Sequence, residues 1–360
     1  GSGACITQCP EAINPRLMIS IALNRIRTDK TVRGVNPTAT YYRRMSQIIK
    51  LAAGMQMSPE QYQRITGRKG NPAHADLVFY LGCNVIRTPV IVFSAMDILD
   101  EIGADYAMLG GASNCCGVIH LKLHGDVEGA DALGGTTIDK MASYEPSKVL
   151  TWCPTCVLEF GETTDGFKSY PFDFQHYAHY LAQRLDAFRD KLRPMPQRVA
   201  LHRHDGGLGI DKSVETLLRA IPELELVALD EHEHWAYGCG PGALANVEAM
   251  REQSHQDTMR SAVDAKTDVL ATLYHTCQRD LCVFEGQYPI QVKNWTGILA
   301  TALSLPEHED HYKQMKLHSE ISAALEDTRE FIEANKLDMS SLRKMLPPLL
   351  EGKEKGLSFW

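Results

Sequence analysis

The strongest chemical signal in the sequence is a set of five unevenly spaced cysteines. They follow the pattern Cys-x31-Cys-Cys-x36-Cys-x2-Cys and comprise Cys83, Cys115, Cys116, Cys153 and Cys156. Thiolates are soft ligands that suit iron–sulfur clusters and zinc. The Cys-x2-Cys pair brings two sulfurs to one metal centre, whereas the side chains of the adjacent pair diverge and suit a larger cluster. Five thiolates also exceed the four of a tetrahedral zinc site or a simple cubane.

Iron–sulfur binding is therefore the favoured interpretation of this set. Buried free cysteines are one alternative, because cysteine is often buried in protein cores. A zinc site is another, although it would leave at least one thiolate unused. The chain has ten cysteines and no secretory signal, and clustered cysteines in such a protein more often bind metal or perform redox chemistry than form disulfides.

The elements that must position these cysteines alternate between strands and helices. Short apolar runs predict strands at 77–81, 106–109 and 148–152, and helices are expected near 90–102 and 127–143. This order predicts an α/β fold with a parallel sheet. Each cysteine group falls just after a strand, at the edge where open α/β sheets place their ligands.

The same order of elements returns in the second half of the chain. Strands are predicted at 199–201, 224–229 and 268–273, with helices near 213–220 and 243–263. Asp205 and Gly238 are 33 residues apart, and Cys83 and Cys115 are 32 apart. The sequence therefore predicts a tandem duplication with two related α/β sub-domains.

The spacing of the cysteines, with the motifs Cys115-Cys116-Gly117 and Cys153-Pro154-Thr155-Cys156, closely resembles the cysteine-rich CCG domain in the B subunit of heterodisulfide reductase. Relatives of that family occur as the fused D subunit, in some succinate and glycerol-3-phosphate dehydrogenase assemblies, and in heterodisulfide-reductase-like complexes of sulfur oxidisers. The resemblance covers residues 76–290, about 60% of the chain. It implies that the five cysteines hold a noncubane 4Fe-4S cluster between two sub-domains, where disulfide or thiol substrates react at cluster iron.

The second sub-domain departs from the family pattern, in which it also carries five cysteines. Here the matching positions read Asp205, Gly238, Cys239, Tyr274 and Cys277, with Cys282 nearby. An empty pocket, a Zn2+ site on Cys239, Cys277 and nearby Asp205 or histidines, and a second iron–sulfur cluster all stay open. Three histidines are candidates for proton transfer at the first cluster, with a structural role as the alternative. They are His202, His204 and His275.

The resemblance also implies partners and an activity. The expected function is that of an electron-transferring oxidoreductase within a heterodisulfide-reductase-like complex. Its expected partners resemble the flavin-carrying A subunit of that complex and its ferredoxin-like C subunit. The preferred variant is a sulfur-oxidising complex that acts on a small thiol or disulfide, or on carrier-bound sulfur. One alternative is an electron-relay, assembly or anchoring subunit of a respiratory dehydrogenase, with a cluster but no substrate chemistry. A zinc-stabilised interaction module is another.

Four regions are expected along the chain. Residues 1–70 form a helical segment that resembles the end of the ferredoxin-like C subunit, because Cys5-x3-Cys9-Pro10 matches the close of a ferredoxin cysteine run. Cys5 and Cys9 are therefore weak candidates for metal binding. The first CCG domain is expected at 76–195 and the second at 196–305, followed by a helical tail at 306–360. That tail either packs on the core or docks on a partner.

Composition excludes two classes of function. The net charge of −8 and the lack of a basic stripe argue against nucleic-acid binding. No apolar run approaches the roughly 18 residues of a membrane-spanning helix. The expected location is the cytoplasm, with membrane association through partners as an option. Gly1-Ser2-Gly3 reads as a tag scar or as the cut edge of a longer chain.

Overall fold

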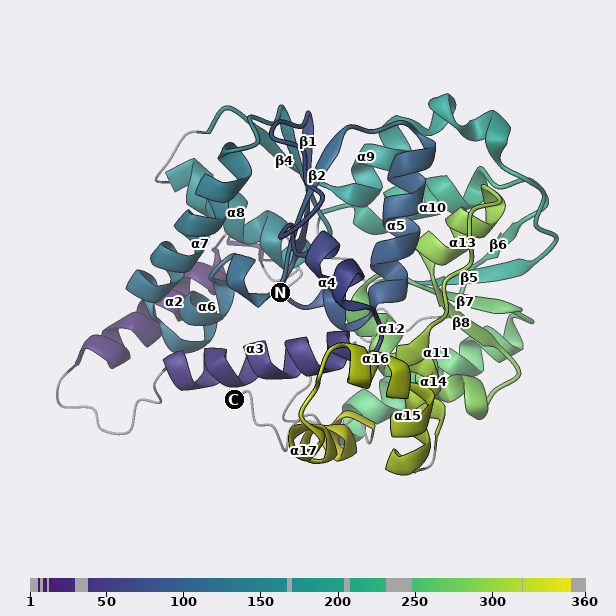
Figure 1. Cartoon of the computed structure of the whole chain (residues 1–360). Helices are drawn as coiled ribbons and strands as arrows, with labels where there is room; N and C mark the ends of the chain where they lie inside the picture. The colour runs from purple at the N-terminus through teal and green to yellow at the C-terminus, as the bar shows by residue number, and fades with distance from the viewer. Residues whose placement is uncertain are drawn as a thin grey trace.

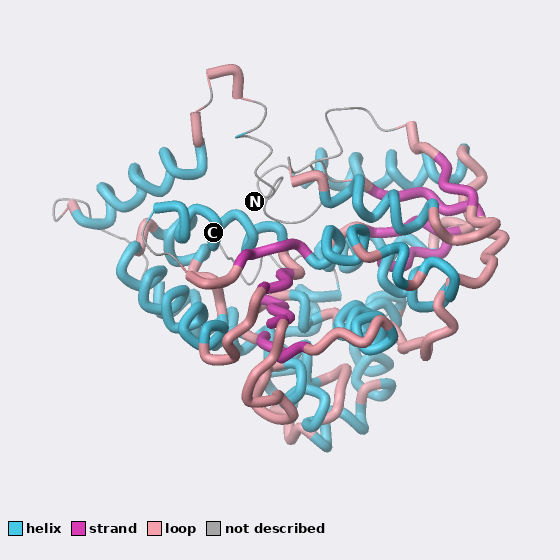
Figure 2. The backbone as a smooth tube through the Cα atoms, turned by 90° about the horizontal axis from the view of Figure 1, so that it is seen from above, coloured by secondary structure: helices cyan, strands magenta, loops and turns pink. Residues whose placement is uncertain are grey.

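The computed structural model describes residues 6, 9–11, 13–29, 38–166, 170–203, 208–230, 248–318 and 320–350. Within them, eight strands form two four-stranded parallel sheets with helices packed around each sheet (Figure 1). Seen from above, the strands gather into two separate groups (Figure 2). The predicted α/β fold with two repeated units is therefore confirmed.

The first sheet has the strand order β2-β1-β3-β4. Its strands are β1 (Leu77–Gly82), β2 (Tyr106–Gly110), β3 (Lys148–Thr151) and β4 (Asp173–His176). Side chains of β1 alternate between two apolar cores, because successive residues of a strand point to opposite faces. All six residues of β1 are buried, as expected for a central parallel strand covered on both faces. The accompanying helices are η1 (Val85–Arg87), α5 (Pro89–Glu101), η2 (Ala112–Asn114), α6 (Val118–His124), α7 (Val127–Ala142), α8 (Pro154–Gly166) and α9 (Tyr177–Gln183).

The second sheet repeats this topology in the order β6-β5-β7-β8. Its strands are β5 (Arg198–His202), β6 (Glu225–Val227), β7 (Val269–Thr272) and β8 (Gln291–Asn294). Val199 of β5 pairs with Leu226 of β6 and with Val269 of β7. The helices of this repeat are α10 (Ile210–Arg219), α11 (Glu248–Asp264), α12 (His275–Leu281), η5 (Cys282–Gly286) and α13 (Trp295–Ala302). Short turns η3 (Leu185–Ala187) and η4 (Arg189–Lys191) connect the two repeats.

The two repeats meet through equivalent helices. Helix α5 packs on α13, and α9 packs on α10, and all four lie between the sheets (Figure 1). Within the repeats, α5 corresponds to α10 and α9 corresponds to α13, so these two contacts are related by pseudo-two-fold symmetry. One continuous apolar core runs through this seam from the first repeat to the second. Loops at the seam are therefore held by both repeats.

Further helices precede and follow the two repeats. They are α2 (Pro15–Thr28), α3 (Thr38–Gly54) and α4 (Pro59–Ile65) from the first part, and α14 (His311–Leu317), α15 (Ile321–Asp327), α16 (Arg329–Ala334) and α17 (Met339–Leu350) from the last. A capping box formed by Ser58 and Gln61 is present at the start of α4. Asn335 donates to the carbonyl oxygens of Gly54 and Met57 at 3.0 and 2.8 Å. The tail up to Leu350 is thus packed on the core, and residues 351–360 lie outside the described part of the chain.

Candidate functional site

The five cysteines of the first set lie at the carboxyl edge of the first sheet. Cys83 directly follows β1, and Cys153 lies two residues beyond the end of β3. Cys115 and Cys116 follow β2 after the η2 turn. From β1 the chain continues to β2 on one side of β1, and it then returns to form β3 on the other side. The strand order therefore reverses between β1 and β3. Such a reversal opens a crevice where α/β sheets bind ligands.

The loops that carry these cysteines depend on two glycines. Gly82 has a φ of +72°, and a Cβ there would lie 3.3 Å from the sulfur of Cys156. Gly117 has a φ of +84°, and a Cβ there would lie only 2.5 Å from the carbonyl oxygen of Ala130 on α7. The glycine of the Cys-Cys-Gly motif is therefore required both by its backbone conformation and by the close approach of α7.

The five sulfur atoms form a continuous row. The sulfurs of Cys116 and Cys156 are 3.6 Å apart. Cys115 is hydrogen-bonded to both Cys83 and Cys116, and Cys153 is hydrogen-bonded to Cys156. The order along the row is therefore Cys83, Cys115, Cys116, Cys156 and Cys153, so residues far apart in the sequence end up as neighbours.

The acidity of the thiols differs from one position of this row to another. Hydrogen bonds from Cys116 and Cys83, together with the backbone N–H of Gly117, hold the pKa of Cys115 well below its usual value. A hydrogen bond from Cys156 and the backbone N–H groups of Cys156 and Thr155 lower the pKa of Cys153 to about 6. The pKa values of Cys83, Cys116 and Cys156 are raised by their sulfur neighbours and by burial. At least two positions thus favour the thiolate, which is the form that binds metal.

The arrangement differs from that of a single-ion site. Among the residues that the structure describes, no three His, Cys, Asp or Glu side chains surround a common ion position. The sulfurs instead contact one another in sequence, and a single tetrahedral ion binds four ligands, so it would leave at least one of the five without a metal bond. A group with several metal atoms fits this row of donors better than one zinc ion does.

Two charged clusters beside the sulfur row were not recognised from the sequence. Glu159 on α8 is buried, has its pKa raised by that burial, and pairs with Arg16 of α2 at 3.0 Å. On α6, His120 Nδ1 lies 3.1 Å from Asp126 Oδ2, and the nearby His120 ring contributes to the lowered pKa of Cys115. The only sequence signals were positional: Glu159 follows Cys156 by three residues, and His120 follows Gly117 by three.

The second repeat places different residues at the matching positions. Tyr274 and Cys277 follow β7 as Cys153 and Cys156 follow β3, and Cys277 is buried. His202 ends β5 and is also buried. His255 on α11, which sequence analysis overlooked, has its pKa lowered to about 3 by burial and by nearby His202. His204, Asp205 and Cys239 lie outside the described residues, so the metal content of this site stays a prediction.

The structure places the remaining predicted site residues in different environments. His275 is buried and its Nδ1 accepts a hydrogen bond from Trp152 Nε1 at 3.3 Å. Burial lowers the pKa of His275 well below its usual value, which keeps the ring neutral. Cys282 is buried and lies 3.7 Å from the carbonyl oxygen of Arg279. Cys9 is half-buried, and Cys5 lies outside the described residues.

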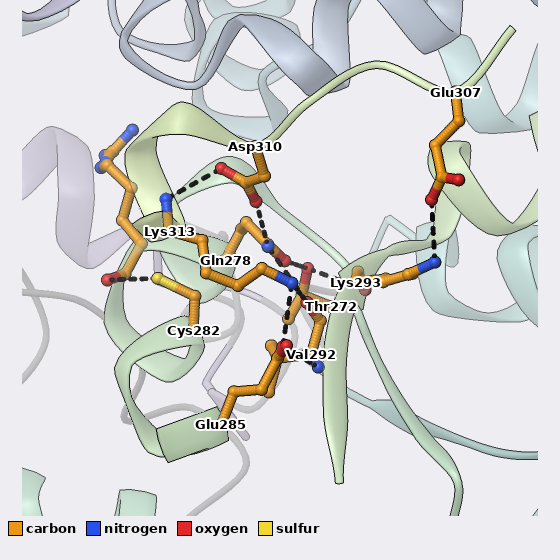
Figure 3. A network of polar contacts seen from close by, with 10 residues as sticks. Thr272, Gln278, Cys282, Glu285, Val292, Lys293, Glu307, Asp310 and Lys313 are labelled. Atoms are coloured by element: carbon orange, nitrogen blue, oxygen red, sulfur yellow. Dashed lines mark hydrogen bonds and ion pairs between the residues drawn. The ribbon is translucent and has the colours of Figure 1, made fainter. Parts of the chain in front are cut away.

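A cavity of about 420 Å³ lies at the seam between α5 and α13. Gln278, Asp310 and Lys313 contribute to its lining and belong to the polar network in Figure 3. Gln278 Nε2 donates to Asp310 Oδ2 at 2.8 Å, and Lys313 Nζ lies 2.9 Å from Glu285 Oε2. These groups satisfy one another, so the network mainly fixes the surrounding elements. No member of the five-cysteine set is among the described lining residues.

Comparison with known proteins finds one family model that matches a segment of each repeat. The family model described as "Cysteine-rich domain", CCG, matches residues 77–161 and again 202–281. The two matched segments correspond to the two sheets, so the duplication extends to sequence as well as topology.

Several curated relatives are named as the D subunit of dihydromethanophenazine:CoB–CoM heterodisulfide reductase. The protein from Methanosarcina barkeri is 24% identical over 302 residues, which cover 78% of this chain and 70% of the relative. The one from Methanosarcina acetivorans is 23% identical over 84% of this chain and 76% of its own length. The one from Methanosarcina mazei is 23% identical over 78% and 70%.

Two further observations complete the comparison. The solved structure of Picrophilus torridus aspartate racemase aligns with 66% of this chain and 97% of its own, but at a TM-score of 0.31 and 12% identity. A likeness this weak supports no argument about fold or activity. Within the described residues, every helix is too short or too polar to span a lipid bilayer.

Proposed function

Because the chain carries two CCG cysteine-rich domains and is homologous to heterodisulfide reductase subunits, we propose that it is an iron–sulfur oxidoreductase subunit that performs redox chemistry at sulfur. The cofactor in this proposal is a noncubane 4Fe-4S cluster held by Cys83, Cys115, Cys116, Cys153 and Cys156. The observation that carries it is the row of five neighbouring sulfurs at the point where the strand order reverses. When bound, such a cluster supplies electrons and an iron site accessible to sulfur ligands.

The protein groups around the row suit this task. Backbone N–H groups of Gly117, Thr155 and Cys156 point at the sulfurs of Cys115 and Cys153. Such hydrogen bonds stabilise negative charge on sulfur ligands and tune cluster potential. Side chains of the second repeat also reach the loops of the row, because Arg279 Nη1 donates to the carbonyl oxygen of Asn84, while Cys83 and Cys153 themselves are half-buried.

The reaction that we propose is the interconversion of a disulfide and two thiols. Reduction consumes two electrons and two protons and cleaves one S–S bond. The electrons come from a flavin-carrying partner or from a ferredoxin-like partner, which resemble the A and C subunits of heterodisulfide reductase, and in the oxidising direction they return to it. His202 and His204 are proposed to carry protons, whereas the hydrogen bond from Trp152 assigns His275 a positional task. We place this activity in a cytoplasmic complex that reaches membranes only through partners.

Metal analysis tests the cofactor. Protein purified without oxygen should contain about four iron atoms and equivalent sulfide per chain. Cys116→Ala removes a central sulfur of the row and should abolish the iron signal or reduce the cluster to a smaller form. Cys282→Ala is the matched control, because Cys282 is equally buried but lies outside the row. Full iron content and an unchanged spectrum in Cys116→Ala would refute the ligand assignment.

A second measurement separates substrate chemistry from electron relay. A small disulfide is added to the reduced protein and the electron paramagnetic resonance spectrum is followed. Binding of a substrate sulfur at the cluster should change the g values. An unchanged spectrum, with the cluster still reoxidised by a partner, would identify a relay or anchoring subunit of a larger dehydrogenase instead. Zinc without iron would identify an interaction module.

A further inference from the structure

Helix α12 of the second repeat occupies the place that α8 occupies in the first. Helix α8 begins directly after Cys153 and contains Cys156, whereas α12 follows Tyr274 and contains Cys277. The position of Pro154 is taken by His275. The second repeat has therefore kept the helix but changed the residues at its start, and these residues have acquired contacts outside their own repeat.

His275 reaches the loop that carries Cys153. The indole Nε1 of Trp152, the residue just before Cys153, donates to His275 Nδ1 at 3.3 Å, and both side chains are buried. The Trp152 ring is stacked on Trp295 of the second repeat at 6.0 Å between ring centroids. Its carbonyl oxygen accepts from His176 Nε2 at 2.7 Å. The residue that leads into Cys153 is thus fixed at its ring and at its backbone.

Arg279 reaches the loop that carries Cys83. It lies four residues after His275, so both side chains leave the same face of α12. Its Nη1 donates to the carbonyl oxygen of Asn84 at 3.4 Å and to Thr88 Oγ1 at 3.3 Å, and the side chain is buried. Asn84 is the residue directly after Cys83.

The helix that makes these contacts is itself anchored by Gln278. Gln278 accepts from Thr272 Oγ1 at 2.8 Å and donates to Asp310 Oδ2 and to the Val292 carbonyl oxygen at 2.8 and 3.3 Å. Figure 3 shows Gln278 at the centre of this network, between β7, β8 and the segment that leads into α14. Movement of α12 along the seam would break these bonds.

We propose that α12 is a positioning element for the five-cysteine site, with His275 and Arg279 as the positioning residues. Cys83 and Cys153 are the two ends of the sulfur row, and each is held through an adjacent residue by one side chain of α12. One rigid helix therefore sets the distance between the ends of the row. In this proposal the second repeat supports the five-cysteine site through α12, although it does not carry the matching set of cysteines. The part of this inference that concerns the cluster rests on the proposed function.

The test removes the acceptor that holds Trp152. His275→Leu fills a similar space but leaves the buried indole N–H without its acceptor, whereas His275→Asn keeps an acceptor at the same place. Loss of iron to a chelator should be about tenfold faster or more in His275→Leu, the usual range for groups that orient metal ligands. The midpoint potential and the g values should shift as well, and His275→Asn should restore all three. Arg279→Met should act in the same direction.

Asp268→Ala is the matched control. Asp268 accepts from the backbone N–H of Arg198 at 2.7 Å, at the amino edge of the same second sheet. This variant should lower the melting temperature but leave the potential and the g values unchanged. The proposal is overturned if His275→Leu and Arg279→Met keep the wild-type spectrum and rate of iron loss. If His275→Leu does not fold, Trp152→Phe removes the donor of the same bond and replaces it in the test.

A separate readout distinguishes failure of this inference from failure of the proposed function. If the wild-type protein contains no iron, the proposed function is wrong, and the positioning role is tested on the thiols alone. Cys153 should then be alkylated faster in His275→Leu than in the wild type, because its loop is released. An equal rate in both would overturn the positioning role.

Discussion

The two repeats share a fold but differ in what stands at the ends of their strands. Both have the strand order in which the first two strands lie on one side of the reversal and the last two on the other. At this reversal the first repeat gathers five cysteines, while the second presents His202, Tyr274 and Cys277. The comparison teaches that the sheet topology creates the crevice, and that the loop residues alone decide its chemistry.

The largest expected effect in this comparison concerns the glycine of the Cys-Cys-Gly loop. Gly117→Ala places a Cβ 2.5 Å from the Ala130 carbonyl oxygen and keeps a φ of +84°, so α7 or the Cys-Cys-Gly loop must move. The conformational strain alone costs about 1–2 kcal/mol, and the clash adds to it. We expect loss of most iron and a clearly lower melting temperature.

Gly209→Ala in the second repeat is the matched control. Gly209 also has a positive φ, of +64°, but no atom of the described residues lies within 4 Å of the added Cβ. Only the conformational strain of about 1–2 kcal/mol applies there, and iron content should stay at the wild-type value. Equal iron loss in both variants would show that the cluster responds to general destabilisation rather than to the Cys-Cys-Gly loop.

The central strands of both repeats could be predicted because their residues are almost all apolar. The runs at 77–81, 148–152 and 268–273 correspond to β1, β3 and β7. Strands β4 and β8 were missed. Each has only four residues, of which a single one is apolar, and lies at the edge of its sheet. The sequence pattern of such a short edge strand is hard to distinguish from that of the adjoining loops.

In the candidate site, too, one part could be predicted from the sequence, and the other depends on how distant segments of the chain pack. Proximity of the five cysteines follows from one rule, that parallel strands end at a common edge. The bond from Trp152 to His275 and the reach of Arg279 to Asn84 depend on how α12 packs across the seam, and no spacing within the sequence encodes this. For the same reason, sequence analysis left His275 open between proton transfer and a structural role, and its buried bond from Trp152 became visible only in the structure.

The smallest expected effect is one that the two repeats share, namely acid sensitivity. Burial lowers the pKa of His176 in the first repeat and of His255 in the second to about 3. An unfolded histidine titrates near 6.5, so between about pH 3 and 6.5 the unfolded chain binds protons that the folded chain does not. The free energy of unfolding should therefore fall as pH drops below 6.5, by about 1.4 kcal/mol per pH unit for each such histidine.

Removing one of these histidines tests the sign and the size of this dependence. His255→Gln should reduce the slope between pH 5 and 6 by about one proton, or about 1.4 kcal/mol per pH unit, whatever its effect on stability at pH 7. Denaturant titrations of both proteins without oxygen, at several pH values, give the two slopes, and contributions from the cluster cancel in their difference. Equal slopes would mean that His255 is protonated in the folded protein. His255 in the second repeat would then carry a positive charge, and it would differ from the neutral, buried His176 of the first repeat.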